Sequence, residues 1–256
     1  MSRDFTFEIY EELLQASLEA GYEHLTVREY IGRKKLPEKF IIHRHDVDRK
    51  PENALAMAQI EARNGISSTY YFRTIEKTFR LDLIPEIEKL GHEIGYHYED
   101  MDRADGDVDL AHQSFEAELA RMRAIANIDT VCMHGNPLTR YDNRDMWANR
   151  SPSEYGLLGE AYISMDFVDV TYFSDTGRTW VDGDLKVKDH PVGESQKNIQ
   201  VEDTNELIRI INDGEIHRLC LLSHPNRWAA TKSEYMAELA KDTTTNVGKT
   251  VLTLLR

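Results

Sequence analysis

Short apolar runs alternate with amphipathic stretches along this 256-residue chain, and this alternation restricts its fold more than any other feature. The runs have the length of strands, and the stretches between them carry apolar residues at helical spacing. Strand alternating with helix predicts βαβ units and a mostly parallel sheet, hence an α/β fold. The predicted strands cover residues 40–42, 66–72, 92–98, 130–133, 168–173 and 219–222. The predicted helices cover residues 51–64, 81–90, 109–126 and 204–213.

No linker rich in Pro, Gly or Ser and no internal repeat divides the sequence. Its length suits a single α/β barrel as well as two smaller domains. The chain carries 31 Lys and Arg against 45 Asp and Glu, a formal net charge of −14. Nucleic acid and anionic membrane surfaces would repel such a charge, so we expect neither as a partner.

The cysteines and the N-terminus indicate the compartment. Cys132 and Cys220 each lie late in an apolar run, so we expect both to be reduced and buried, in a reducing compartment. No stretch approaches the roughly 18 apolar residues of a membrane span. Acidic residues stand near the N-terminus, where a secretory signal would be apolar. The sequence therefore predicts a soluble, cytoplasmic protein that is not integral to a membrane.

Two carboxylates follow the first predicted strand, in the sequence Asp46-Val47-Asp48. Residues two apart in an extended chain point to the same side, so Asp46 and Asp48 share one side. Two acids on one side repel each other unless a cation or a proton lies between them. The alternative is that they are solvated loop acids or cap the helix that begins at Pro51.

Histidines follow three further strands. His97 and Glu99 share a side by the same parity, and His134 and His224 each come directly after an apolar strand and before a turn. Each histidine alone is explained as a hydrogen-bonded polar group. In parallel α/β folds, however, sites lie at the carboxyl ends of the strands. Two Asp and three His gathered there form a ligand set suited to zinc or another first-row divalent metal.

Three segments, Phe40–Asp48, Gly91–Glu99 and Leu221–His224, resemble three motifs of the NodB-type polysaccharide deacetylases, carbohydrate esterase family four. The similarity extends roughly from residue 38 to residue 228 and is closest to the cytoplasmic branch found with surface-polysaccharide biosynthesis. The resemblance implies a distorted (β/α) barrel of the glycoside hydrolase/deacetylase type, typically with seven strands. We accordingly expect one barrel domain over residues 1–256, with residues 1–37 as an N-terminal helical extension.

The resemblance also implies roles for individual residues. The leading Asp46 corresponds to the general base of the family and the trailing Asp48 to a metal ligand. His97 corresponds to a second metal ligand. In the last motif, Leu222 corresponds to an apolar residue of the substrate site and His224 to the general acid.

Two departures from the family pattern affect the metal site and the substrate site. Met101 stands where the family has a second metal-binding histidine, and a thioether is a poor ligand for a hard or borderline metal. His134 and Glu99 are the candidates to complete the ligand set, with His134 favoured because an imidazole restores the expected chemistry. The Arg-and-Pro motif of the family is replaced by residues 134–137, in which Asn136 is a candidate substrate contact.

The segment Tyr172–Trp180 resembles the Asp-and-Trp motif of the same family. The resemblance implies that Asp175 orients the base through a positive partner, with Arg178 near it, and that Trp180 lines the sugar pocket. The alternative is a surface turn with a partly buried tryptophan.

Together these residues predict a metal-dependent hydrolase that removes an acetyl or formyl group from an amino sugar or a related precursor. The expected cofactor is a divalent ion, zinc first, with nickel, cobalt, iron or manganese as alternatives. The expected substrate is a small acetylated sugar or one linked to a nucleotide or a lipid. The oligomeric state is not predicted.

Two other functions remain open. The loss of the second histidine is also typical of a non-catalytic scaffold that binds a glycan or a partner protein. A haloacid-dehalogenase-type phosphatase would use Asp46 as nucleophile and Asp48 as acid. That family, however, usually has Thr or Gly soon after the second Asp, where this chain has Arg49-Lys50-Pro51, and it has no use for the histidines.

Overall fold

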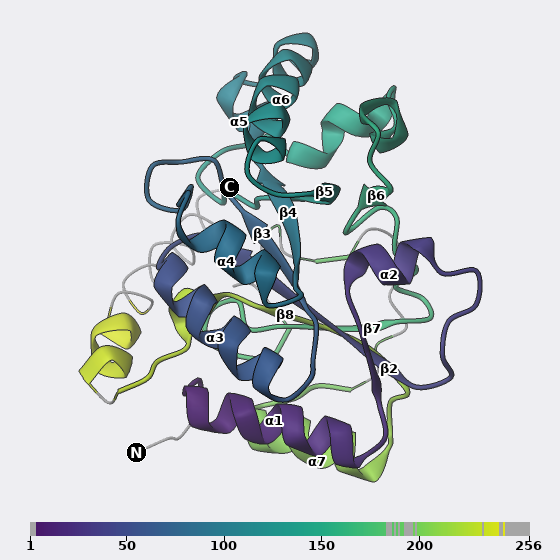
Figure 1. Cartoon of the computed structure of the whole chain (residues 1–256), viewed down its shortest axis with the longest axis vertical. Helices are drawn as coiled ribbons and strands as arrows, with labels where there is room; N and C mark the ends of the chain where they lie inside the picture. The colour runs from purple at the N-terminus through teal and green to yellow at the C-terminus, as the bar shows by residue number, and fades with distance from the viewer. Residues whose placement is uncertain are drawn as a thin grey trace.

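A parallel sheet forms the centre of the structure, a computed structural model that describes residues 4–182, 186, 188, 190–191, 197, 199–231, 233–240 and 243. Seven strands follow one another in the order β6-β5-β4-β3-β2-β8-β7, and β1 pairs with β2 outside this path (Figure 1). Every described pair of strands is parallel. The strands are β1 (Glu23–Leu25), β2 (Phe40–Val47), β3 (Thr69–Phe72), β4 (Glu93–Tyr98), β5 (Ile128–Met133), β6 (Gly159–Glu160), β7 (Thr171–Ser174) and β8 (Arg218–Ser223).

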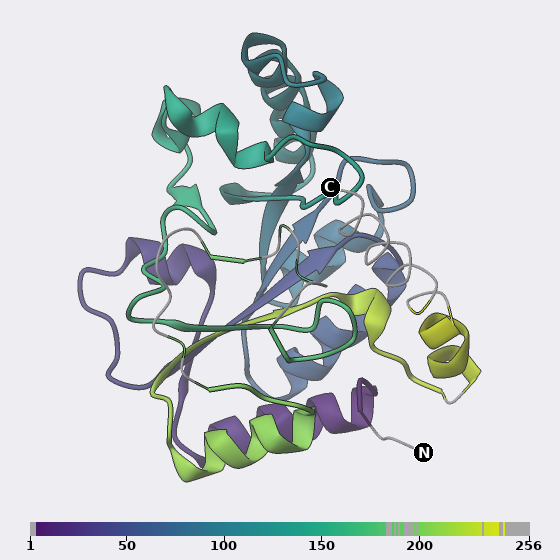
Figure 2. The same ribbon diagram turned by 180° about the vertical axis from the view of Figure 1, so that it is seen from behind.

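The strand order is that of a barrel with one open seam. Strands β2 to β6 are neighbours in chain order, and β8 returns to the other side of β2 with β7 beyond it. The described residues show no pairing between β6 and β7, and the sheet curls as a half-barrel (Figures 1 and 2). The predicted α/β fold with a parallel, barrel-like sheet is thus confirmed.

Helices cover the outside of the curled sheet. In both views α1 lies beside α7 below the sheet, and α3 lies beside α4 on its outer face (Figures 1 and 2). The helices are α1 (Phe7–Glu19), α2 (Val27–Gly32), α3 (Pro51–Arg63), α4 (Leu83–Lys89), α5 (Asp100–Arg103), α6 (Val108–Arg123) and α7 (Thr204–Asp213). Three short 3₁₀ helices are η1 (Asn143–Ala148), η2 (Pro152–Tyr155) and η3 (Pro225–Arg227).

Local sequence explains where several helices begin and end. Pro51 occupies the first turn of α3, where a missing N–H costs nothing. The side chains of Asp107 and Asp203 accept backbone N–H groups at the starts of α6 and α7. Gly214 ends α7 with a φ of 66°, a left-handed conformation that favours glycine.

The first 37 residues contain more than the expected helical extension. Helices α1 and α2 lie there, but β1 lies between them and pairs with β2, with Leu25 opposite Ile42. Ile9 and Leu13 of α1 are buried in the core. This segment therefore completes the sheet and its outer layer.

Strand β2 separates two hydrophobic clusters, because successive side chains of a strand point to opposite faces. Phe40 and Ile42 belong to the cluster that includes β3, β4 and β5, and Ile41 belongs to the cluster under α1 and α7. By the same alternation, Arg44 and Asp46 lie on the face of Ile42. That face leads directly to the candidate site at the end of the strand.

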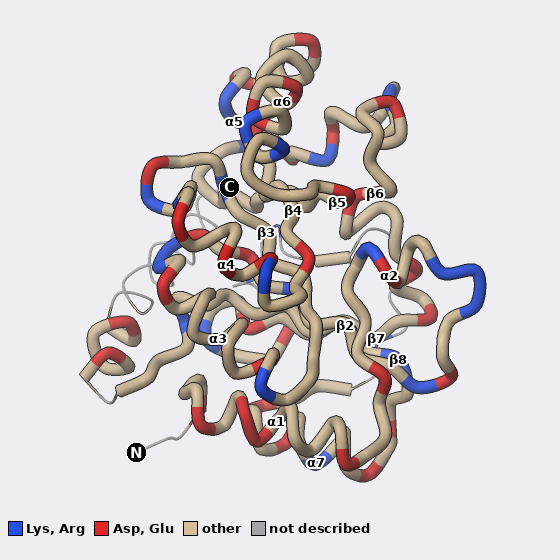
Figure 3. Tube along the Cα trace, in the orientation of Figure 1, with Lys and Arg blue, Asp and Glu red and all other residues tan. Residues whose placement is uncertain are grey.

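Charge is spread over the described surface rather than gathered by sign. In Figure 3 blue and red segments alternate, with acidic segments along α1 and α7. Within the described residues, no helix is long and apolar enough to cross a membrane. Cys132 and Cys220 are both buried and form no disulfide, which confirms that part of the sequence analysis.

Candidate metal centre and active site

Four strands bring Asp and His residues to one edge of the sheet. Asp48 directly follows β2, His97 lies near the end of β4, and His134 and His224 directly follow β5 and β8. Asp48 is at the centre, because its Oδ1 lies 3.5 Å from His97 Nε2 and 3.4 Å from His134 Nε2. Its Oδ2 lies 3.9 Å from His224 Nε2. The structure thus brings together residues that are up to 176 positions apart (224 − 48) in the sequence.

Asp48, His97 and His134, here called the outer set, have the chemistry of metal ligands, and Asp48 lies close to both imidazoles. Bonds of about 2.0–2.1 Å to a tetrahedral ion place ligand atoms roughly 3.3–3.4 Å apart. The distances from Asp48 Oδ1 to the two imidazole nitrogens are close to this spacing, at 3.5 and 3.4 Å. Asp48 Oδ1 is also buried and has no hydrogen-bond partner among the described atoms. A divalent cation would satisfy this oxygen, so the residues present fit a metal ion.

A backbone carbonyl fixes the orientation of the His97 imidazole, and backbone hydrogen bonds fix the main chain of His134. His97 Nδ1 lies 3.0 Å from the Cys132 carbonyl oxygen, an acceptor, so this nitrogen carries the proton and Nε2 keeps its lone pair. The backbone N–H of His134 donates to the Tyr98 carbonyl at 2.7 Å, and the His134 carbonyl accepts from Asn143 Nδ2 at 2.8 Å. Such contacts orient metal-binding histidines in proteins.

Burial and neighbouring charges act differently on the pKa values of the three residues of the outer set. Burial opposes ionisation of Asp48, but His134, His97 and His224 hold its pKa well below the ordinary value. Burial lowers the pKa of His134 to about 4, against the attraction of Asp48. Burial also opposes charging of His97, but Asp46 and Asp48 raise its pKa. An ionised Asp48 beside a neutral His134 is the form in which both bind a cation.

Glu99 lies behind His134 and faces two arginines. Its carboxylate accepts from Arg73 and Arg103, and its Oε2 lies 3.4 Å from His134 Nδ1. Of the two candidates for the missing ligand, only His134 therefore faces Asp48. Met101, at the position of the family's second histidine, is buried in the hydrophobic core.

Asp46 is held by an arginine that the sequence analysis did not single out. Arg44 is fully buried and donates to both carboxylate oxygens of Asp46, at 3.1 Å from Nε and 2.8 Å from Nη2. Asp46 Oδ2 lies 3.7 Å from His97 Nε2. The parity that put Asp46 and Asp48 on one side also puts Arg44 there, so this signal was present in the sequence.

His224 is oriented by Asp175. The Asp175 carboxylate lies 2.7 Å from His224 Nδ1 and accepts the His224 backbone N–H at 2.8 Å. Arg227 and Trp228 donate to it at 2.8 and 2.9 Å. Burial opposes its ionisation, but Arg227 and His224 lower its pKa to about 2. Asp175 was expected to orient the base, and the structure instead places it against the candidate acid.

Two expected substrate contacts, Trp180 and Arg178, lie elsewhere, which corrects their assignment. Trp180 is fully buried in the core under α1 and α7, and its Nε1 donates to Thr204. Arg178 lies over the rings of Phe5 and Tyr235, and Arg227 is the cation beside Asp175. Both positions depend on the long connection after β7, where the alternation of side chains along a strand predicts no orientation.

Leu222 and Asn136 also differ from expectation. Leu222 is fully buried inside β8, where it pairs with Arg44 of β2, so it contacts no substrate. Asn136 lies in the turn after His134 and accepts the Leu138 N–H through its own Oδ1 at 3.0 Å. Its side chain stabilises that turn.

A second group of ligand atoms lies deeper in the sheet. Asp46, His97 and Cys132, here called the inner set, are buried and place one ligand atom each within 4.8 Å of one another, so they could hold a metal ion. The two sets share His97 and differ in access. Exposed side-chain fractions are 23% for Asp48 and 13% for His134, against 5% for Asp46, while Cys132 is fully buried. Only the outer set leaves room for a substrate.

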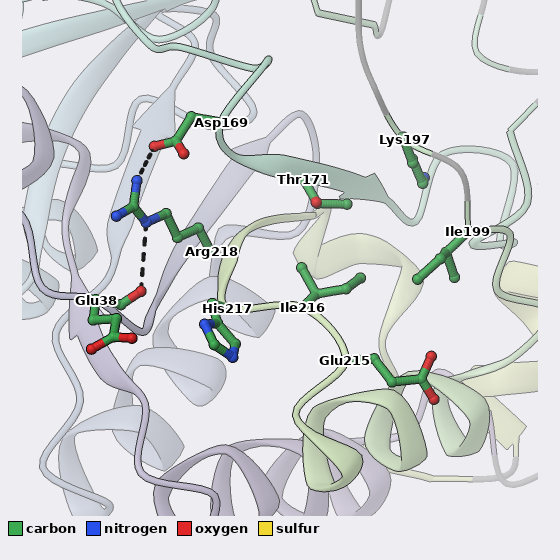
Figure 4. Close-up of a pocket in the computed structure, with 9 residues that line it drawn as sticks. All are labelled: Glu38, Asp169, Thr171, Lys197, Ile199, Glu215, Ile216, His217 and Arg218. Carbon is green, nitrogen blue, oxygen red and sulfur yellow. Dashed lines mark hydrogen bonds and ion pairs between the residues drawn. The ribbon is translucent and has the colours of Figure 1, made fainter.

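The cavity in Figure 4, of about 560 Å³, lies at the opposite end of the strands. Thr171 and Arg218, the first residues of β7 and β8, line it, together with Glu38 before β2. Arg218 pairs there with Asp169 (Figure 4). Because ligands of parallel α/β sheets bind at the carboxyl ends of strands, we place the candidate site at the outer set and not in this cavity.

Comparisons with protein-family models, with curated proteins and with solved structures found no match to this chain.

Proposed function

We propose that this protein is a metal-dependent hydrolase that removes an acetyl or formyl group from an amino sugar or a related carbohydrate precursor. The observation that carries the proposal is the convergence of two imidazole nitrogens on the unpartnered Oδ1 of Asp48, at 3.4 and 3.5 Å. Asp48, His97 and His134 would hold a divalent ion, with zinc favoured by the nitrogen and oxygen ligands. When bound, such an ion lowers the pKa of a water to about 7 and polarises a carbonyl.

Asp46 is proposed as the general base. Its carboxylate lies between Arg44 and His97 at the end of β2. Arg44 fixes the orientation of both carboxylate oxygens. Asp46 would accept a proton from water as that water attacks the acyl carbonyl. A positioned base of this kind contributes roughly 10²–10⁴-fold to a rate.

His224 is proposed as the general acid. Its Nδ1 faces the Asp175 carboxylate, which fixes the tautomer, and its Nε2 faces Asp48 at 3.9 Å. His224 Nε2 would deliver a proton to the departing amine as the C–N bond breaks. Asp175 holds the imidazole in position for this transfer.

We propose that the sugar occupies a cavity beside η1, which the Asn143 side chain connects to the His134 backbone; no Asp or His of the outer set lines this cavity. This cavity, of about 570 Å³, is lined by Asp142, Arg144 and Trp147, among others, and η1 begins there at Asn143, which donates to the His134 carbonyl. Pockets of this size hold small ligands, and carboxylates with an aromatic ring suit hydroxyl groups and a sugar face. We therefore favour a carbohydrate over other acylated amines.

The two other functions fit the geometry less well. The strand order runs β2 to β6 without reversal, whereas doubly wound folds reverse at the first strand. Three histidines around Asp48 also have no role in a phosphatase that uses an aspartyl nucleophile. A non-catalytic scaffold would not need the held pair Asp175–His224, which resembles the arrangement of an acid in hydrolases.

The test is a screen of acetylated sugar nucleotides for release of acetate, with and without added zinc, cobalt, nickel, iron or manganese. We expect metal-dependent release that Asp46→Asn abolishes while metal content is kept. The matched variant Asp169→Asn changes an exposed carboxylate at the opposite end of the strands and should retain turnover. Metal-independent release, or full activity in Asp46→Asn, would contradict the proposal. A metal-loaded protein without turnover on any acylated sugar would favour the scaffold.

A further inference from the structure

We propose that the inner set, Asp46, His97 and Cys132, is a second metal site that binds a thiophilic divalent cation such as zinc or cadmium, and that its occupation blocks the hydrolase. The binding site stands on its own geometry, whereas the blocking effect rests on the proposed function. The three ligand atoms lie within 4.8 Å of one another, close enough for one ion. One carboxylate, one imidazole and one thiolate are ligands that zinc commonly combines.

The inner set is a closed site. Asp46 and His97 are 3% and 1% exposed, and Cys132 is fully buried in β5. Burial of all three side chains gives a substrate no access to an ion held there, and a catalytic ion needs that access. An ion bound by the inner set would therefore not replace the ion of the outer set in the reaction.

A cation at the inner set competes with the outer set for His97. His97 Nδ1 faces the Cys132 carbonyl, so a single lone pair, on Nε2, is available for a metal. That nitrogen lies 3.7 Å from Asp46 Oδ2 and 3.5 Å from Asp48 Oδ1. One lone pair binds one ion at a time. Occupation of the inner set thus removes a ligand from the outer set and also engages the proposed base, Asp46.

Arg44 lies beside the inner set, where its positive charge favours a thiolate over a thiol at Cys132. Its guanidinium is fully buried, and its Nη1 has no hydrogen-bond partner among the described atoms. Metal binding converts the Cys132 thiol to a thiolate, with the proton released to solvent, and a nearby cation stabilises a thiolate. Carboxylate and thiolate together offset the charge of a divalent ion. Each Asp46 oxygen keeps a lone pair for the metal beside its bond to Arg44.

Cys220 provides a matched control. It is also fully buried in a strand of the same sheet, but it is not a member of the group of metal-ligating atoms found in the described part of the chain. A substitution of Cys220 therefore changes a buried thiol without changing the inner set.

The first measurement uses cobalt, whose bonds to a thiolate give a charge-transfer band in the near ultraviolet. Metal-free wild-type protein, Cys132→Ser and Cys220→Ser are titrated with Co²⁺ beyond one equivalent. We expect the band in wild type and in Cys220→Ser, and its loss in Cys132→Ser and in Cys132→Ala. A His134→Ala protein, whose outer set lacks one ligand, that binds Co²⁺ without a thiolate band overturns the inner site. A band of equal strength in Cys132→Ser also overturns it.

The second measurement is inhibition of acetate release by Cd²⁺. We expect half-inhibition of wild type and of Cys220→Ser at a Cd²⁺ concentration at least about tenfold below that for Cys132→Ser, since disturbing a metal site costs 10–100-fold in affinity. Equal inhibition of all three proteins overturns the blocking effect. Because the cobalt band needs no turnover, it tests the inner site even where the proposed hydrolase activity fails.

Discussion

Acid should destabilise this protein through His24, a partly buried histidine that the fold keeps neutral. The His24 ring stacks on His43 with centroids 5.2 Å apart and an angle of 12° between the planes. Its Nδ1 is buried and has no hydrogen-bond partner within the described structure. Burial lowers the pKa of His24 to about 4, although Glu61 acts in the opposite direction. A proton on His24 would place a charge beside the His43 ring.

The size of the effect follows from linkage between protonation and folding. Above pH 6.5 the ring is neutral in the folded and the unfolded chain, so stability does not change. As the pH falls from 6.5 toward 4, the unfolded chain binds a proton at His24 and the folded chain does not. One pKa unit corresponds to about 1.36 kcal/mol, so a pKa lowered from 6.5 to about 4 gives a full loss of about 3.4 kcal/mol.

The assay is urea unfolding at pH 7 and at about pH 4.5, on wild type and on His24→Phe, which keeps a ring against His43. We expect wild type to lose about 2.5 kcal/mol more than His24→Phe between these two pH values. His217→Gln, at an exposed position, is the control and should behave like wild type. Equal losses in wild type and His24→Phe would refute the reasoning.

Three further predictions concern contacts around the site. Asp175→Asn removes the charged carboxylate that accepts hydrogen bonds from His224, Arg227 and Trp228. We expect a loss of about 3 kcal/mol in the free energy of unfolding, measured with urea, and a fall in kcat larger than any rise in KM. An unchanged kcat would contradict the role of Asp175. Arg44→Met should cost about 3–5 kcal/mol because it leaves the Asp46 charge buried, and the double change with Asp46→Leu should regain most of it. An Arg44→Met variant as stable as wild type would disprove this. Gly95→Ala should lower the free energy of unfolding by about 1–3 kcal/mol in thermal or urea unfolding, because a Cβ there would overlap the Tyr71 ring and lie 2.9 Å from the Thr130 carbonyl oxygen. An unchanged free energy of unfolding would show that β4 can shift.

The sequence predicted the convergence at the strand ends because parallel topology brings those ends to one edge. Asp48, His97, His134 and His224 each follow or end an apolar run, and no detail of helix packing was needed to place them together. The prediction that Asp46 and Asp48 share one side of β2 was also confirmed, since both carboxylates lie within 3.7 Å of His97 Nε2. The choice between His134 and Glu99 required side-chain positions, because two arginines decide where Glu99 points.

Sequence reasoning failed where the position of a residue depends on a long connection or on a partner outside its own strand. Trp180 lies after β7 in an irregular stretch, and its burial depends on the packing of α1 and α7. Arg227 reaches Asp175 only because η3 turns back after β8. Cys132 was expected to be buried, but its nearness to Asp46 and His97 depends on the pairing of three strands. Strand β6 has two residues, too few for a periodic signal.

The most direct test of the outer set is metal content after equilibration of the metal-free protein with one equivalent of Zn²⁺ and removal of unbound ion. We predict one zinc per chain in wild type and in Glu99→Gln. We also predict at least about a tenfold weaker affinity when Asp48→Asn or His134→Ala, each of which removes a ligand of the outer set, is added to Cys132→Ser, which lacks the thiol of the inner set. Zinc held equally well by Cys132→Ser with and without Asp48→Asn would contradict the claim that Asp48, His97 and His134 bind one ion.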